Sequence, residues 1–223
     1  MKQFFVTATG TGVGKTVVTA RFIRELSAAG KTVNAIKPVI TGFTWHALQY
    51  SDTGRLLSAL DLKPEFENVK ALSPWRFEEP LSPDMAASRE DRAVDFDELI
   101  EFCRDTMANG GDVGLIEGVG GVMVPMDKTH TVADWITTLD IPCIVVVGSY
   151  LGTLSHTLTT VEAMRARGLE IATLVVSESE DSPVPLEETV ETIRRFLPDI
   201  DLRSLPRGKY SPDQPELLVD LAT

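Results

Sequence analysis

Short, continuously apolar runs alternate along the chain with longer segments that mix apolar and polar residues. The apolar runs lie at residues 4–7, 33–36, 113–116, 143–147 and 171–176. They are apolar at consecutive positions rather than at every second one, which is typical of strands that are buried on both faces of a sheet. The pattern therefore predicts five buried strands.

The segments between these runs carry the periodicity of amphipathic helices. Helices are predicted at residues 15–29, 52–60, 96–107, 132–139, 155–167 and 186–196, and the polar, proline-rich stretch from 37 to about 83 holds only the second of them. This alternation predicts an α/β fold with a doubly wound, mostly parallel sheet flanked by helices, as a single domain over residues 1–223. Ligands of such sheets bind beyond the carboxyl ends of the strands, so we expect the site in the loops after the strands.

Composition narrows the class of protein. The chain of 223 residues has a formal net charge of −12, which argues against a nucleic-acid surface because the phosphates would be repelled. No apolar run approaches a membrane-spanning length, and the first run is too short for a signal peptide. Cys103 and Cys143 lie in apolar segments and are expected to be buried, reduced thiols. We expect a cytoplasmic protein without a membrane or nucleic-acid partner.

The stretch FFVTATGTGVGKTVV at residues 4–18 predicts a phosphate-binding loop of the P-loop NTPase type. It matches G-x-x-x-x-G-K-[ST], except that Thr9 stands at the first glycine. Its glycines let backbone N–H groups turn toward an anion, and the following helix adds its free amides and its dipole. Lys15 would bring a charge to the outer phosphates, and the Thr16 hydroxyl would bind Mg²⁺. A purely structural glycine turn would explain neither residue.

Three further charged residues are candidates for the same site. Glu117 follows the strand at 113–116 and is either a Mg²⁺ ligand or a solvated residue at the strand end. Lys37 follows the strand at 33–36 and is either a second cation for a phosphoryl group or a surface charge. Asp52 stands at a predicted helix start, where it either caps the helix or binds the metal.

In this combination the chain resembles dethiobiotin synthetase, an ATP-dependent enzyme family of biotin biosynthesis. The matching segments are FVTATGTGVGKT, IKPVITG, SD at 51–52, EEPLSPDMAA, IEGVGGVMVP, ADWI, VVGSYLGTLSHTLTT and GLEIATLVVS, which together span roughly residues 4 to 177. The resemblance implies a ligase that joins 7,8-diaminopelargonate, CO₂ and ATP into dethiobiotin, ADP and phosphate, with Mg²⁺ as cofactor. It also implies a homodimer whose active site is shared between subunits.

The resemblance further implies a role for each matching residue. The residues implied in catalysis are Lys15, Lys37 and Thr11, and those implied to hold Mg²⁺ are Thr16, Asp52 and Glu117. The implied nucleotide contacts are Gly12, Val13, Gly14, Lys15, Thr16, Val17, Glu117, Gly118, Gly120, Ser177 and Pro206. The implied substrate contacts are Lys37, Thr41, Ser82 and Gly120, joined by Leu151, Gly152 and Ser155 from the second subunit.

Three positions depart from the usual sequence of that family. Ala8 stands where glycine is common, Asp84 replaces the histidine of S-P-H, and Ser177 stands where an asparagine often contacts adenine. The base of the nucleotide is therefore left open by the sequence, with ATP as the default.

Other interpretations of the same loop remain. A partitioning-type P-loop ATPase, which is a dimeric switch, usually has an additional lysine early in the loop, and residues 8–13 contain none. The amidotransferase-linked synthetases of cobalamin biosynthesis need a glutaminase domain, for which 223 residues are too few. A non-catalytic binding module would not need Lys15, Thr16, Asp52 and Glu117 together.

Overall fold

The computed structural model describes residues 1–208 and 216–222. Within this part of the chain, six parallel strands form one sheet in the order β2-β5-β1-β6-β7-β8. The strands are β1 (Lys2–Ala8), β2 (Val33–Ile36), β5 (Val113–Glu117), β6 (Cys143–Val147), β7 (Ile171–Ser177) and β8 (Leu202–Leu205). All five predicted strands are present, and the predicted parallel α/β architecture is confirmed.

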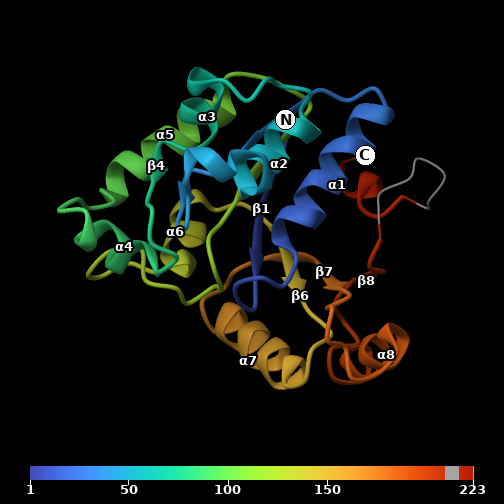
Figure 1. The fold of residues 1–223 in the computed structure, drawn as a ribbon. Helices are drawn as coiled ribbons and strands as arrows, with labels where there is room; N and C mark the ends of the chain where they lie inside the picture. Colours follow the sequence, from blue (N-terminus) through green and yellow to red (C-terminus); the bar gives the residue numbers. More distant parts are fainter. Residues whose placement is uncertain (209–215, 223) are drawn as a thin grey trace.

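Helices cover both faces of this sheet (Figure 1). One apolar cluster joins the sheet to α1 (Lys15–Ala28), α2 (Asp52–Ala59), α3 (Phe66–Leu72), the 3₁₀ helix η1 (Trp45–Tyr50) and the 3₁₀ helix η2 (Val219–Ala222). The other joins it to α4 (Pro83–Arg89), α5 (Phe96–Ala108), α6 (Val132–Leu139), α7 (Thr153–Ala166) and α8 (Leu186–Phe196). Consecutive residues of β1 serve opposite clusters, Phe4 and Val6 the first and Phe5 the second. Burial on both faces explains why the strands are apolar at consecutive positions.

The two ends of the chain meet on the α1 side of the sheet (Figure 1). The backbone N–H groups of Leu217 and Leu218 donate to the buried Glu25 carboxylate of α1 at 3.0 and 3.2 Å. Lys2 Nζ of β1 donates to the carbonyl of Leu221 at 3.4 Å. The C-terminal segment is therefore fixed against the helix that follows the phosphate loop.

The segment between β2 and α5 holds more structure than its sequence predicts. Besides α2 it forms η1, α3 and α4, and a small parallel sheet of β3 (Val39–Ile40) with β4 (Trp75–Arg76). Strands of two residues are too short to give a periodic pattern. The start of α4 had a signal that the prediction missed, because Pro83 at the first helical position after Ser82 is a common helix start.

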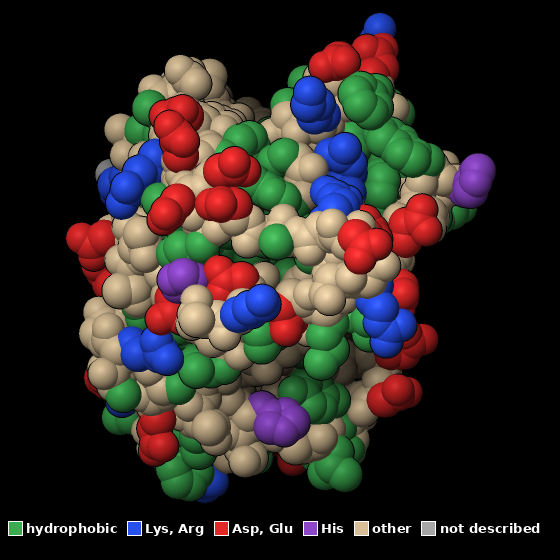
Figure 2. Space-filling model, turned by 90° about the vertical axis from the view of Figure 1, so that its left-hand side faces the viewer, with side chains coloured by type: hydrophobic (Ala, Val, Ile, Leu, Met, Phe, Trp, Pro, Cys, Tyr) green, Lys and Arg blue, Asp and Glu red, His purple; other side chains and the backbone are tan. Residues whose placement is uncertain are grey.

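Side chains of both charges are interspersed on the face shown in Figure 2, and hydrophobic side chains are grouped between them. Cys103 and Cys143 are both buried, as predicted, and neither is in a disulfide. Burial raises the pKa of each thiol to about 12. Among the helices of the described residues, none has the length and apolar character needed to cross a membrane.

Candidate active site

The phosphate loop connects the central strand β1 to α1. Gly14 is the N-cap of α1 and has a φ angle of 105°, in the left-handed region that favours glycine. A Cβ atom at this position would lie 2.5 Å from the Ser177 hydroxyl oxygen. Both the backbone conformation and the close packing therefore require glycine here, and no side chain of the described residues caps the helix. The first amides of α1 are left available to an anion.

Lys15 is buried, although it follows a loop of polar and small residues. Its Nζ atom donates to the carbonyl oxygens of Gly10 at 2.9 Å and Gly120 at 2.7 Å. Burial, with a smaller contribution from the nearby Lys37, lowers the pKa of Lys15 to about 8. The side chain is thus folded back over the loop, with its ammonium group held at the place where the strands β1 and β5 end.

Thr16, Lys37 and Glu117 form a buried network beside the loop. Glu117 Oε1 accepts hydrogen bonds from the Thr16 hydroxyl at 2.7 Å and from Lys37 Nζ at 2.8 Å. Lys37 Nζ also donates to the carbonyl of Gly118 at 2.9 Å. Burial alone would lower the pKa of Lys37. Attraction to the Glu117 carboxylate outweighs this effect and raises the pKa of Lys37, so this lysine stays charged. The interpretations of Glu117 and Lys37 as solvated surface charges are wrong.

Asp52 joins this network from α2. Its Oδ2 atom lies 3.3 Å from Lys37 Nζ, and its side chain is partly exposed to the cleft. Partial burial alone would raise the pKa of Asp52, but attraction to Lys37 outweighs it, so the pKa of Asp52 is lowered. The interpretation of Asp52 as a helix cap is also wrong, since Ser51 is the N-cap and its hydroxyl accepts from the Gly54 N–H at 3.1 Å. The side chain of Asp52 is left to face the cleft.

The residues at this point fit a hard divalent cation. Glu117 Oε2 is buried and has no hydrogen-bond partner among the described residues, which is costly for a carboxylate oxygen unless a cation binds there. The Thr16 hydroxyl and the Asp52 carboxylate lie beside it in the same network. The described residues hold no group of three or more His, Cys, Asp and Glu side chains of the kind that holds a metal alone. Phosphate oxygens and waters would have to complete a Mg²⁺ shell here.

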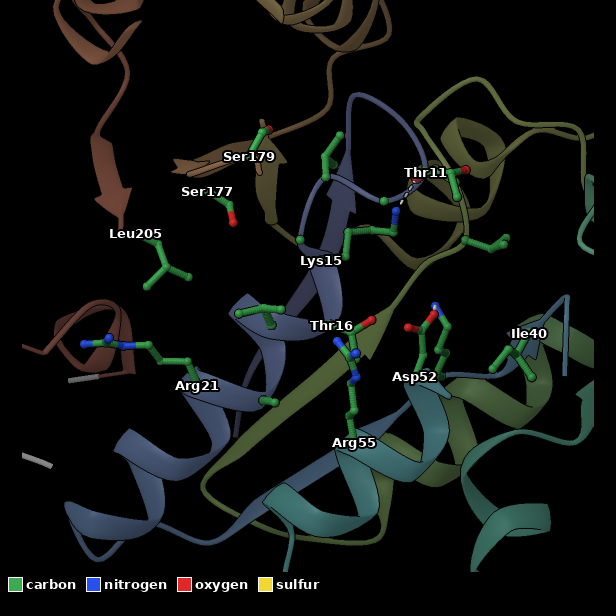
Figure 3. A pocket seen from close by; sticks show the side chains of 18 of the residues that line it. Thr11, Lys15, Thr16, Arg21, Ile40, Asp52, Arg55, Ser177, Ser179 and Leu205 are labelled. Carbon is green, nitrogen blue, oxygen red and sulfur yellow. Dashed lines mark hydrogen bonds and ion pairs between the residues drawn. The ribbon is translucent and has the colours of Figure 1, made fainter. Parts of the chain in front are cut away.

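A cleft of about 1270 Å³ runs past these groups (Figure 3). The predicted residues that line it are Thr11, Gly12, Val13, Gly14, Lys15, Thr16, Val17, Lys37, Thr41, Asp52, Ser82, Gly120, Ser177 and Pro206. The cleft thus has an end beside β7 and β8, at Ser177 and Pro206, and an end beside α4, at Ser82. Lys15 and Asp52 lie between these ends, where Figure 3 shows their side chains directed into the cleft.

The Ser82 end of the cleft differs from the pattern implied by the sequence resemblance. The Ser82 hydroxyl donates to the Asp84 carboxylate, so the residue that replaces histidine is the partner of a predicted substrate contact. Thr41 lies at the same end, beside Gly42, and both Ser82 and Thr41 are partly buried.

Leu151, Gly152 and Ser155 lie outside the cleft of their own chain. They stand at the start of α7, where Gly152 is the N-cap and has a φ angle of 99°. Leu151 is 86% exposed, and Ser155 is exposed as well. One chain therefore does not bring these predicted substrate contacts to its own phosphate loop.

Several groups at the cleft were missed by the sequence analysis. The carbonyl oxygens of Gly10 and Gly120 hold Lys15, and no sequence pattern signals backbone acceptors. Further arginines line the cleft: Arg21, Arg24, Arg55 and Arg207. Arg55 had a signal, because it follows Asp52 by three positions and so faces the same side of its helix.

Similar folds occur among solved structures of cell division and plasmid partition proteins. A MinC:MinD cell division complex from Aquifex aeolicus matches with a TM-score of 0.57 at 14% identity, over 100% of this chain and 85% of that chain. A plasmid partition protein from Borrelia burgdorferi bound to AMPPNP matches with a TM-score of 0.54 at 13% identity, over 96% of this chain and 92% of that chain. At this level of identity the likeness shows the fold alone.

Comparison of sequences is more specific. A family model described as an AAA domain matches residues 2–207. The ATP-dependent dethiobiotin synthetase of Acidiphilium cryptum is 48% identical over 88% of this chain and 89% of its own length. The enzyme of the same name from Caulobacter vibrioides is 44% identical over 93% of this chain and 94% of its own length. The chain belongs to the family of ATP-dependent dethiobiotin synthetases.

Proposed function

We propose that this protein is a cytoplasmic ligase that uses ATP and Mg²⁺ to convert 7,8-diaminopelargonate and CO₂ into dethiobiotin. The observation that carries the proposal is the network of the buried Lys37, Glu117 and Thr16 with the partly exposed Asp52 beside the phosphate loop. It brings two carboxylates, a hydroxyl and a second lysine close to Lys15. Phosphoryl transfer depends mainly on such positioning and charge neutralisation.

The nucleotide would lie along the cleft from the phosphate loop toward Ser177 and Pro206. The amides at the start of α1 and the Lys15 ammonium group would bind its outer phosphates. Thr16, Asp52 and Glu117 would hold Mg²⁺, which supplies charge neutralisation for the β- and γ-phosphate oxygens. Glu117 Oε2, which has no other partner among the described residues, supports this assignment.

The reaction would proceed in three steps. One amine of the diamine adds to CO₂ and loses a proton, which gives a carbamate. A carbamate oxygen then attacks the γ-phosphorus, the bond to ADP breaks, and a carbamic-phosphoric anhydride forms. Finally the second amine attacks the carbonyl carbon, and phosphate and a proton leave as the cyclic urea closes.

Lys37 is the residue best placed to serve the carbamate and the phosphoryl group in transit. It stays charged because of its attraction to Glu117 and Asp52, and it lines the same cleft as the phosphate loop. A carbamate oxygen is already anionic, so this step needs a fixed cation rather than a general base. Thr11, at the exposed side of the loop, would contact the same group.

The substrate carboxylate would be bound by a second copy of the chain. The start of α7 offers free amides and the positive end of a helix dipole, and Ser155 lies in its first turn. Two apolar side chains beside it, Leu151 and Leu154, are 86% and 38% exposed, which suits a surface that a partner covers. We propose a homodimer in which this helix start completes the partner's cleft.

Product analysis tests the proposal. Incubation with the diamine, ¹³C-bicarbonate and Mg-ATP should give a labelled product that has gained one carbonyl group and lost two hydrogens. One ADP and one phosphate should appear for each ring closed. Phosphate release that needs no diamine, without labelled product, would instead indicate an ATPase of the switch type, whose fold is similar.

A further inference from the structure

The charges that the proposed function uses are already balanced within the chain. Lys15 and Lys37 carry two positive charges, and Asp52 and Glu117 carry two negative ones. Lys37 lies 2.8 Å from Glu117 and 3.3 Å from Asp52, so these carboxylates largely compensate its charge. Mg-ATP is a net anion, and a site without surplus positive charge would bind it poorly. A further cation is therefore needed at the phosphates.

Two of the other arginines that line the cleft have acidic partners. Arg21 Nε lies 2.6 Å from Glu25, on the same helix. Arg207 lies 2.9 Å from Glu180, at the end of the cleft beside β8. Figure 3 shows Arg21 on the side of Leu205 rather than on the side of Asp52, and Arg207 follows Leu205 by two residues. Neither adds much to the charge around Lys15 and Thr16.

Arg55 differs from both. It lies on α2 three residues after Asp52, and its side chain lines the cleft. Figure 3 shows it directed from α2 toward the part of the cleft that Thr16 and Asp52 line. Among the described residues, no hydrogen bond or ion pair involves the guanidinium group of Arg55. The side chain is exposed, so it contributes little to packing and is available to a ligand.

We propose that Arg55 is a phosphate-binding residue that contacts the triphosphate of ATP from the α2 side. The guanidinium group is planar and always charged, and it pairs with two phosphate oxygens at once. Its position beside the Mg²⁺ ligands places it on the outer phosphates rather than on the base. This inference rests on the proposed function, since it needs a nucleotide along the cleft.

Nucleotide affinity tests the proposal through the variant Arg55→Gln. The matched control is Arg194→Gln, which removes an exposed arginine from α8, away from the cleft. We expect Arg55→Gln to weaken binding of Mg-AMPPNP, a non-hydrolysable ATP analogue, about tenfold in Kd, which corresponds to about 1.4 kcal/mol. Arg194→Gln should leave the Kd unchanged, and Arg55→Lys should keep part of the affinity because it keeps the charge.

One further ligand, AMP, and one further variant, Lys15→Ala, make the outcomes distinct. The Kd of AMP should not change in Arg55→Gln, because AMP lacks the outer phosphates; an equal loss for AMP would overturn the assignment. If Lys15→Ala weakens Mg-AMPPNP binding and Arg55→Gln does not, the inference on Arg55 is wrong and the nucleotide site stands. If neither variant changes the Kd, the nucleotide is not bound in this cleft, and the proposed function fails with the inference.

Discussion

The helices α1 and α7 begin alike but are placed differently. Each starts at a glycine N-cap with a left-handed φ angle, 105° at Gly14 and 99° at Gly152, and neither has a capping side chain among the described residues. The start of α1 lies inside the cleft, where Lys15 and Ser177 surround it. The start of α7 lies on the surface, beside the exposed Leu151.

The two helix starts thus have similar backbone geometry, but one chain surrounds the start of α1 with further side chains and leaves the start of α7 exposed. At α1 a single chain supplies the amides, a lysine and the residues proposed to hold Mg²⁺. At α7 it supplies the amides and exposed apolar side chains, and a ligand there would be open to water on one side. The difference suggests that α1 serves the nucleotide within its own chain, whereas α7 serves the substrate of a partner.

The largest expected effect is at α1. Lys15→Ala removes the cation that lies over the loop, and turnover should fall by about 10²-fold or more, as when one preorganised donor is lost. The hydrogen bonds that Lys15 makes to Gly10 and Gly120 are at the edge of a cleft that water can enter. The free energy of unfolding should therefore fall by no more than about 1 kcal/mol. Steady-state kinetics and thermal unfolding measure the two quantities, and near-wild-type turnover would remove Lys15 from the chemistry.

A smaller effect is expected for the metal. Glu117→Gln keeps the size of the side chain but removes the charge that a hard cation prefers, so half-maximal activity should need about tenfold more Mg²⁺. A titration of activity with Mg²⁺ measures this shift, and circular dichroism checks that the fold persists. If the Mg²⁺ requirement stays the same, Glu117 only orients Lys37.

The smallest expected effect depends on pH. Burial lowers the pKa of Lys15 to about 8, so its charge is present below that pH and is lost above it. Binding of a polyanion favours the charged form, and the affinity for ADP in EDTA should fall about tenfold between pH 7 and pH 9. Lys37, whose pKa is raised, stays charged over this range. Lys15→Arg serves as the control because its charge does not titrate, and an equally flat profile in the unchanged protein would refute the role of Lys15.

The sequence was most informative where a pattern of residues is typical of one kind of structure. Glycines before Lys15 and Thr16 predicted the loop, and continuous apolar runs predicted the buried strands, so β1 and its neighbours were found. The edge strand β8 was missed because it is short and carries Arg203 and Ser204, so its residues give no apolar run. α7 begins two residues before its predicted start, because Thr153 gives no apolar signal.

The sequence predicted many of the residues that line the cleft but not the contacts among them. Lys37 and Asp52 were candidates, yet only the fold shows that both contact the network of Glu117. Asp52 was ambiguous because aspartate occurs both at helix caps and at metal sites, and the structure assigns the cap to Ser51. Contacts made through the backbone, such as the Gly118 carbonyl to Lys37, have no side-chain pattern to reveal them.

Mixing two inactive variants measures most directly whether the nucleotide half and the carboxylate half of one site come from different chains. Lys15→Ala disables the first half, and Ser155→Trp blocks the second, because a bulky side chain in the first turn of α7 covers the amides that an alanine would leave free. Each variant alone should be inactive. After random subunit exchange about half of the dimers are mixed, and each has one intact site of two, so activity should approach about a quarter of the unchanged protein. A mixture as inactive as its parents, with exchange verified by native mass spectrometry, would place Lys15 and Ser155 in one chain's site and contradict the account.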